Sequence, residues 1–244
     1  MSLPNALHTL SSAYDLPLVD LLDYANEDPH DGWDHGAGSW PTGSIWKVEG
    51  VVLYALIRAL KPASVLELGT WHGCSATHML EAVKRNDNGA KVTSVDNHYQ
   101  AQSQGGAAIG GMIPDPLRDC WVYENADILE FMQAEQGHYD FIFEDGFHDP
   151  AQVEAVWREG QRVLSPGGVM VSHDALHHLV GNDVQAGMMA AGISDPLLLK
   201  IAPSDCGLAV WKREGTLNEP ATKKPPAKRR RKASRSRKAK SNAG

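Results

Sequence analysis

The residues of this sequence best placed to do chemistry together are carboxylates at the ends of short apolar runs. Glu67 lies in VLEL, Asp96 ends KVTSVD, Asp145 ends FIFED, and Asp127 directly follows CWVYENA. In a parallel sheet the carboxyl ends of the strands meet at one edge, so side chains there face one crevice. Each carboxylate alone would also fit as a helix cap, as Asp127 would before Ile128. Four of them on successive strands predict one shared site of nucleoside size.

A glycine turn follows the first of these runs. The sequence SVLELGTWHGCSATHML (64–80) indicates a strand, a turn with Gly69 and Gly73, and the start of a helix. Such a turn lets a ligand sit on bare backbone at a helix N-terminus, because glycine permits close approach. The dinucleotide pattern Gly-x-Gly-x-x-Gly is absent. The order is instead Glu-x-Gly-x-x-x-Gly-x-Ser, which begins at Glu67 and ends at Ser75.

Alternating strands and helices would position these groups. We expect further strands at 91–97, 120–126, 139–146 and 168–173, and helices at 16–24, 44–60, 74–85, 128–136 and 151–164. The alternation favours a parallel sheet with helices on both faces. Two last apolar runs, 196–202 and 207–211, are joined by a short link and predict an antiparallel hairpin that closes the sheet.

Two segments have no regular pattern. Residues 26–43 are rich in Gly, Pro and Asp and include two tryptophans and two histidines. This loop could cover a substrate or simply lie on the surface. Residues 100–116 hold four glycines and two prolines, which makes a continuous helix implausible. We interpret them as an insertion near the crevice, either gating a substrate or forming a surface loop.

These motifs resemble the class I S-adenosylmethionine-dependent methyltransferases over about 44–213. The resemblance implies a Rossmann-like, doubly wound α/β sheet of seven strands, mostly parallel, with the C-terminal antiparallel hairpin and helices on both faces. It also implies that S-adenosylmethionine is the cofactor and places it against one set of residues. These are Glu67, Gly69, Thr70, Trp71, Gly73 and Ser75 for the methionine end, Asp96 and Asn97 for the ribose, Asp127 for the adenine, and Asp145.

Within that class, the order Asp-Gly-x-His, Pro-Gly-Gly and His-Asp resembles the small-molecule O-methyltransferase branch. An oxygen nucleophile has to lose a proton, so a base is needed, and His148 is the candidate, with Asp145 beside it. His148 could otherwise be a loop histidine bonded to a neighbour. The resemblance also implies a divalent cation, such as Mg²⁺ or Mn²⁺, held by Asp145, His173 and Asp174. Histidine suits Mn²⁺, Fe²⁺ or Zn²⁺ better than Mg²⁺, so metal dependence stays open.

Composition limits the class of protein. The chain has 244 residues, 42% of them apolar and 22% charged, enough for one substantial core. Three scattered cysteines exclude a disulfide framework and favour a reducing compartment. We expect no secretory signal and no membrane span, and hence a soluble cytoplasmic protein.

The charge is divided unevenly along the chain. Of 23 basic and 30 acidic residues, 11 basic and 1 acidic lie in 217–244, which leaves 12 and 29, or a net charge of −17, in 1–216. The segment 217–244 has no apolar periodicity and is expected to be a disordered basic tail. It could solubilise the protein, contact nucleic acid or an acidic partner non-specifically, or direct nuclear targeting.

The sequence therefore predicts three parts: an N-terminal helix with a lid-like loop (1–43), an S-adenosylmethionine-binding methyltransferase domain (44–216), and the tail (217–244). The favoured function is O-methylation of a small polar molecule, with metal assistance left open and an oligomer allowed. Two alternatives remain: a nucleic-acid methyltransferase recruited by the tail, and a catalytically inactive binding module.

Overall fold

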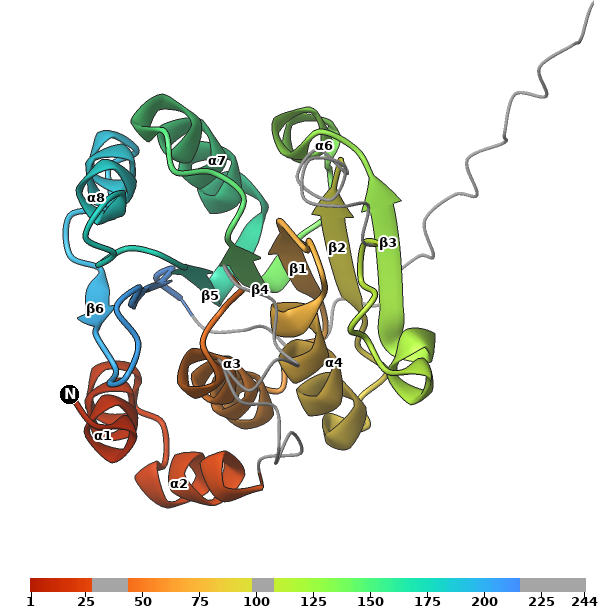
Figure 1. Ribbon diagram of the computed structural model, residues 1–244, viewed down its shortest axis with the longest axis vertical. Coiled ribbons are helices and arrows are strands. Elements are labelled where there is room, and N and C mark those ends of the chain that lie inside the picture. Colours follow the sequence, from red (N-terminus) through yellow and green to blue (C-terminus); the bar gives the residue numbers. More distant parts are fainter. Residues whose placement is uncertain (28–43, 98–107, 216–244) are drawn as a thin grey trace, which may run out of the picture.

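A central sheet of seven strands organises the molecule, in the order β3-β2-β1-β4-β5-β7-β6 (Figure 1). The computed structural model describes residues 1–27, 44–97 and 108–215. Five strands are parallel: β1 (Val65–Leu68), β2 (Val92–Asp96), β3 (Trp121–Asn125), β4 (Tyr139–Glu144) and β5 (Leu164–Ser172). The hairpin of β6 (Leu197–Leu199) and β7 (Leu208–Lys212) is antiparallel, and β7 pairs with β5. The predicted fold class is confirmed, including the closing hairpin.

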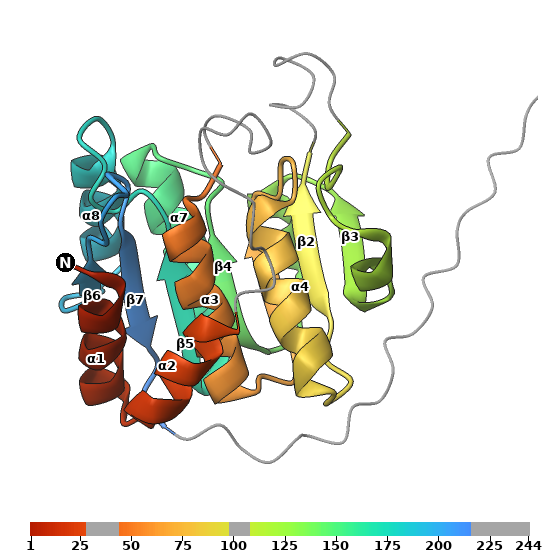
Figure 2. The ribbon, with the colours of Figure 1, turned by 60° about the horizontal axis from the view of Figure 1, so that its bottom comes forward.

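Helices cover both faces of the sheet because successive strand residues point to opposite sides. One face packs against α1 (Leu3–Tyr14), α2 (Leu18–Asn26), α3 (Lys47–Leu60) and α4 (Cys74–Asn86), as Figure 2 shows. The other face packs against α6 (Ile128–Ala134), α7 (Pro150–Val163) and α8 (Gly181–Ala190). On β4, Phe141 and Phe143 enter the first layer and Ile142 enters the second, which is why three consecutive apolar residues are fully buried.

Local sequence explains where several helices begin. Asp149 caps α7 and accepts hydrogen bonds from two backbone N–H groups, with Pro150 at the first helical position. Ser2 caps α1 in the same way, and Gly73 precedes α4 with φ +87°. Helix α3 begins at Lys47, three residues after the expected start at residue 44. The cap is Trp46, whose backbone N–H donates to the Glu49 carboxylate (3.3 Å).

Three described elements were not predicted. Helix α1 has a proline in its first turn and α8 contains two glycines, which make the helical pattern harder to recognise in the sequence. At the end of the expected insertion, and extending beyond it, Asp115–Cys120 forms a short 3₁₀ helix, η1. The rest of that insertion up to residue 107, most of the predicted N-terminal loop, and the basic tail lie outside the described residues. No helix in the described ranges is both long and apolar enough to cross a membrane.

Candidate functional site

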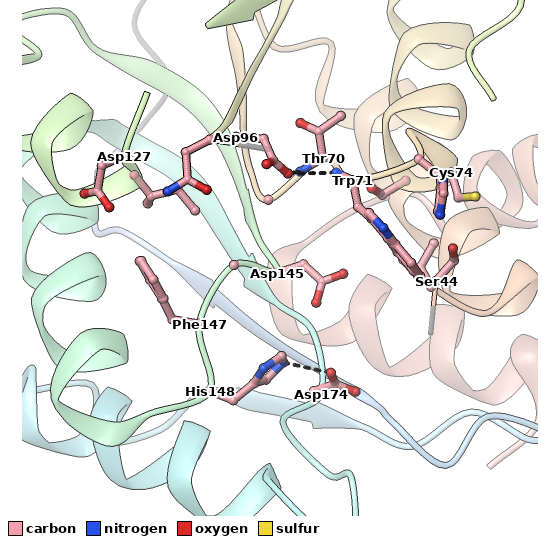
Figure 3. A pocket seen from close by; sticks show the side chains of 17 residues that line it. Ser44, Thr70, Trp71, Cys74, Asp96, Asp127, Asp145, Phe147, His148 and Asp174 are labelled. Carbon is pink, nitrogen blue, oxygen red and sulfur yellow. Dashed lines mark hydrogen bonds and ion pairs between the residues drawn. The ribbon is translucent and has the colours of Figure 1, made fainter. Parts of the chain in front are cut away.

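A cavity lies where the first, second, fourth and fifth strands end, and residues from several loops line it together (Figure 3). The turn after β1 contributes 69–72, with Cys74 and Ser75 behind it, and the segment before α3 contributes Ser44 and Ile45. The remaining lining residues are polar or acidic groups that follow β2 to β5 and their neighbours: Asp96, Asn97, Asp127, Asp145, His148 and Asp174. The structure thus gathers the strand-end carboxylates at one edge, with one exception, Glu67.

Glu67 is fully buried and does not line the cavity. Its carboxylate accepts hydrogen bonds from the hydroxyls of Ser75 (2.6 Å), Thr70 (3.0 Å) and Ser94 (2.5 Å). Burial raises the pKa of Glu67 to about 7, although these three hydroxyls oppose the shift. The side chain therefore holds the glycine turn in shape from beneath and does not face the crevice as expected.

The glycine turn has little room for side chains. Gly69 has φ +89°, and a Cβ there would lie 2.6 Å from the carbonyl oxygen of Asp145. Gly73 also has positive φ, and a Cβ on it would lie 2.7 Å from Ile113. The backbone of the two loops that follow β1 and β4 can therefore meet only if Gly69 has no side chain.

Asp96 connects the second strand to this turn. One of its carboxylate oxygens accepts hydrogen bonds from the backbone N–H groups of Thr70 (3.0 Å) and Trp71 (2.9 Å). Asn97 follows it and also lines the cavity. Asp127 lines the cavity and caps α6 as well, with one oxygen accepting from the N–H groups of Leu129 and Glu130. Both interpretations of Asp127 made from the sequence are therefore compatible with its position.

His148 and Asp174 form a pair at the other end of the cavity (Figure 3). The Nε2 atom of His148 lies 2.9 Å from Oδ2 of Asp174. This hydrogen bond raises the pKa of His148 against the opposing effect of burial. Burial alone would raise the pKa of Asp174, but His148 and His173 lower it well below its usual range. Asp174 is therefore held in its ionised form, and its carboxylate makes the His148 ring more basic.

His173 lies behind Asp145, almost fully buried. Its Nδ1 atom is 3.1 Å from Oδ1 of Asp145, and its Nε2 atom is 3.0 Å from Oε2 of Glu49. Burial disfavours the charged ring, but the neighbouring carboxylates outweigh it and raise the pKa of His173 well above its usual value. The pKa of Asp145 is itself raised by burial, with His173 opposing that shift.

Glu49 is a residue of this site to which the sequence gave no definite role. It lies on the otherwise apolar helix α3, is fully buried, and also accepts hydrogen bonds from Ser204 (2.6 Å) and the Gly207 N–H (2.8 Å). A carboxylate inside the apolar run VEGVVLYALI was the available signal, because a buried charge requires partners.

The predicted metal set of Asp145, His173 and Asp174 does not fit the geometry. Both ring nitrogens of His173 contact carboxylates, so the ring would bind an ion only by giving up one of these contacts. Ligand atoms of Asp145, His148 and Asp174 do lie within 4.8 Å of one another, and so do those of His173, Asp174 and Cys206. An ion at this edge would therefore use one of these two sets.

The comparisons with known proteins agree with this arrangement. A family model described as a methyltransferase domain matches residues 66–175, which run from the first strand to the loop after β5. Within these residues the chain is similar to a methyltransferase domain. Its fold is that of the O-methyltransferase from Bacillus cereus in complex with SAH, at a TM-score of 0.58 and 16% identity, covering 86% of this chain and 97% of that one.

Further relatives extend this comparison. The O-methyltransferase TomG from Streptomyces achromogenes, in complex with SAM, superposes on the methyltransferase domain and its surroundings with a TM-score of 0.54 and 17% identity, over 86% of this chain and 96% of that one. A curated Mycobacterium sp. (strain JLS) protein named "Putative O-methyltransferase" is 29% identical over 133 residues. That alignment covers 54% of this chain and 58% of the relative's length.

Proposed function

We propose that the protein transfers a methyl group from S-adenosylmethionine to an oxygen atom of a small polar molecule. The observation that carries this proposal is the convergence of Asp96, Asp127 and Asp145 with the glycine turn on one cavity. The relatives named as O-methyltransferases support it, as do those whose structures contain SAM or SAH.

The cavity suits the cofactor for a physical reason. Its glycine turn packs closely against the loop after β4, and both segments line the cavity, so a ligand there would meet the turn and Asp145 together. We assign the segment from Gly69 to Ser75 to the methionine end, Asp96 and Asn97 to the ribose, and Asp127 to the adenine side. Glu67 supports the turn from below. When bound, the cofactor supplies a methyl group on a positively charged sulfur.

The acidic lining contributes electrostatic attraction. Asp96 and Asp145 lie on the cavity wall, and a sulfonium-bearing ligand is favoured between carboxylates. Holding the acceptor and the methyl group in line is the main task of such a site, and orientation contributes up to roughly 7–11 kcal/mol. Residues on both sides of the cavity, Ser44 and Phe147 among them, restrict where an acceptor can lie.

His148 is the base in this proposal. Because its Nε2 faces Asp174, the neutral ring donates from that nitrogen and keeps Nδ1 as the proton acceptor. Asp174 fixes this tautomer and stabilises the ring once it has gained the proton, the role that a carboxylate plays beside a catalytic histidine. Asp145 lies close to both groups and adds negative charge.

Calorimetry of the full chain with S-adenosylhomocysteine tests the proposal first. We expect one binding event per chain, weakened in Asp96→Ala. Release of S-adenosylhomocysteine would then be measured across a panel of catechols, phenols, sugars and hydroxy acids. No heat and no thermal shift at millimolar ligand would contradict the proposal and favour a binding module.

The basic segment 217–244 gives the alternative of a nucleic-acid substrate. Against it, residues 1–216 carry a net charge of −17, which repels phosphate. A chain truncated after residue 216 should keep its activity on a small acceptor. Loss of that activity on truncation would favour recruitment by the tail. We also propose that the protein acts in the cytoplasm.

A further inference from the structure

A buried histidine occupies the place where the sequence led us to expect a metal ion. His173 directly follows the fifth strand, and its side chain is only 3% exposed. Its Nδ1 atom lies 3.1 Å from Asp145 and 3.6 Å from Asp174, the two carboxylates that would have held the ion. The same ring atom therefore faces both acidic groups of the cavity edge.

The opposite side of the ring is closed by a third carboxylate. Nε2 of His173 lies 3.0 Å from Glu49, which is fully buried on α3. When both nitrogens of an imidazole contact carboxylate oxygens, both must carry hydrogen for the contacts to be hydrogen bonds. With both carboxylates ionised, only the imidazolium ion donates to each of them, so three acidic groups around one ring favour a positive charge on it.

Glu49 is held too firmly to be an incidental neighbour. One of its oxygens accepts from the Ser204 hydroxyl and the Gly207 N–H, and the other faces His173 and the Trp46 N–H. Three separate segments thus fix one carboxylate: the start of α3, the end of β5, and the link between β6 and β7. Such full satisfaction is what makes a buried charge tolerable and rigid.

We propose that the His173 imidazolium, held by Glu49, is the built-in counter-charge of Asp145 and Asp174 and replaces a divalent ion at this edge. Glu49 is then a positioning residue that acts through His173 on the cavity carboxylates. The catalytic role of Asp145 and Asp174 rests on the proposed methyl transfer. The positive charge of His173 and the lack of a metal site do not depend on it. The competing arrangements are an ion held by Asp145, His148 and Asp174, and an ion held by His173, Asp174 and Cys206, whose thiol also faces the ring.

Metal binding separates the two arrangements directly. Calorimetry and electron paramagnetic resonance of the full chain with Mn²⁺ should show no saturable site in the wild type below about 1 mM. The double variant Glu49→Gln/His173→Asp removes the internal cation and adds a third carboxylate. It should bind Mn²⁺ at least about tenfold more tightly. Adding Asp174→Asn to that variant should abolish the gain.

A second measurement needs no substitution in the protein being observed. Nitrogen-15 NMR of wild-type His173 at about pH 8 should show both ring nitrogens protonated, where an ordinary histidine is neutral. The signal is assigned by its disappearance in His173→Asn. A neutral His173 ring at that pH would overturn the proposal even if the double variant failed to fold.

One other result would overturn it: a wild-type chain that binds one Mn²⁺ tightly and loses it in Asp174→Asn or His148→Ala. Asp140→Asn is the matched control. Asp140 lies near the start of β4, at the end of the strand away from Asp145, and its carboxylate is hydrogen-bonded to Ala63 and Ser165. This variant should change neither readout. Binding of S-adenosylhomocysteine to the wild type reports on the proposed function separately, so either idea can fail alone.

Discussion

The two halves of the cavity treat their carboxylates in different ways. In the half formed by β1 and β2, Glu67 and Asp96 are bonded to hydroxyls and backbone N–H groups, which are neutral donors. In the half formed by β4 and β5, Asp145 and Asp174 are bonded to histidine rings. The first half uses its acids to shape a loop, and the second surrounds them with titratable partners.

The consequence appears in the acidity of these groups. Neutral donors do not offset burial at Glu67, so its pKa rises to about 7. At Asp174 two imidazoles outweigh burial and the pKa falls below its usual range. The hydrogen bond from His148 and the charge of His173 are the largest effects that lower the pKa of Asp174. We expect cofactor binding to depend on the first half and proton transfer on the second.

The largest expected effect separates these two tasks. His148→Ala removes the proposed base and should lower turnover about 100- to 1,000-fold, while the dissociation constant of S-adenosylhomocysteine stays within about threefold. Steady-state kinetics with an acceptor from the panel and calorimetry measure the two quantities. His138→Ala, at the opposite end of β4, is the control. Full activity of His148→Ala would show that His148 is not the base.

The next effect concerns stability and pH. Glu67 holds its proton in the folded state up to about pH 7 but loses it near 4.5 when unfolded, so folding weakens as pH rises through that window. The shift corresponds to about 3 kcal/mol. Glu67→Gln has no such loss. Its free energy of unfolding relative to wild type, from urea titrations, should therefore improve by about this amount between pH 4 and pH 8.

An exposed carboxyl provides the comparison for that experiment. Glu130→Gln, at the start of α6, should show no such trend with pH. If the free energies of unfolding of wild type and Glu67→Gln change in parallel between pH 4 and pH 8, the pKa of Glu67 is not raised in the folded protein.

A smaller effect is expected on cofactor affinity. Asp96→Ala removes the carboxylate from the cavity wall and its bonds to Thr70 and Trp71, and should weaken S-adenosylhomocysteine binding about 10- to 100-fold. Asp96→Asn keeps an acceptor oxygen, so its dissociation constant should lie between those of the wild type and the alanine variant. An unchanged dissociation constant in the alanine variant would exclude Asp96 from the ribose contact.

The smallest effect is a displacement along the pH axis. The bond to Asp174 is the main cause of the raised His148 pKa, so Asp174→Asn should lower it. Because the base must be neutral to accept a proton, the acid limb of the rate profile should move to lower pH by about 1 unit or less. A limb that stays in place would show that another group controls it.

Much of the fold could be predicted from local patterns. The parallel strands are short apolar runs followed by turns, and the hairpin is two runs with a short link, so pattern and length suffice. Helices α1 and α8 were missed because proline and glycines obscure the period of 3.6 residues, and packing on the sheet supplies what propensity lacks. Tertiary contacts decide those cases.

The site was predictable where it depends on strand ends and unpredictable where it depends on long-range contacts. The chain order places Asp96, Asp127 and Asp145 at one edge, and the structure brings them together. Glu67 was expected on the cavity, but the hydroxyls of Thr70, Ser75 and Ser94 hold its carboxylate inside the fold. The contact of His173 with Glu49 spans 124 residues of sequence, and no local pattern encodes it.

The hydrogen bonds from Ser204 and Gly207 to Glu49 carry a practical consequence. These two residues lie in the link between β6 and β7, which does not line the cavity. A change in the position of this link would move Glu49 and so alter the protonation of His173 and of the carboxylates beside it. Substitutions in this link would therefore change the acidity of the cavity carboxylates without replacing any residue that lines the cavity.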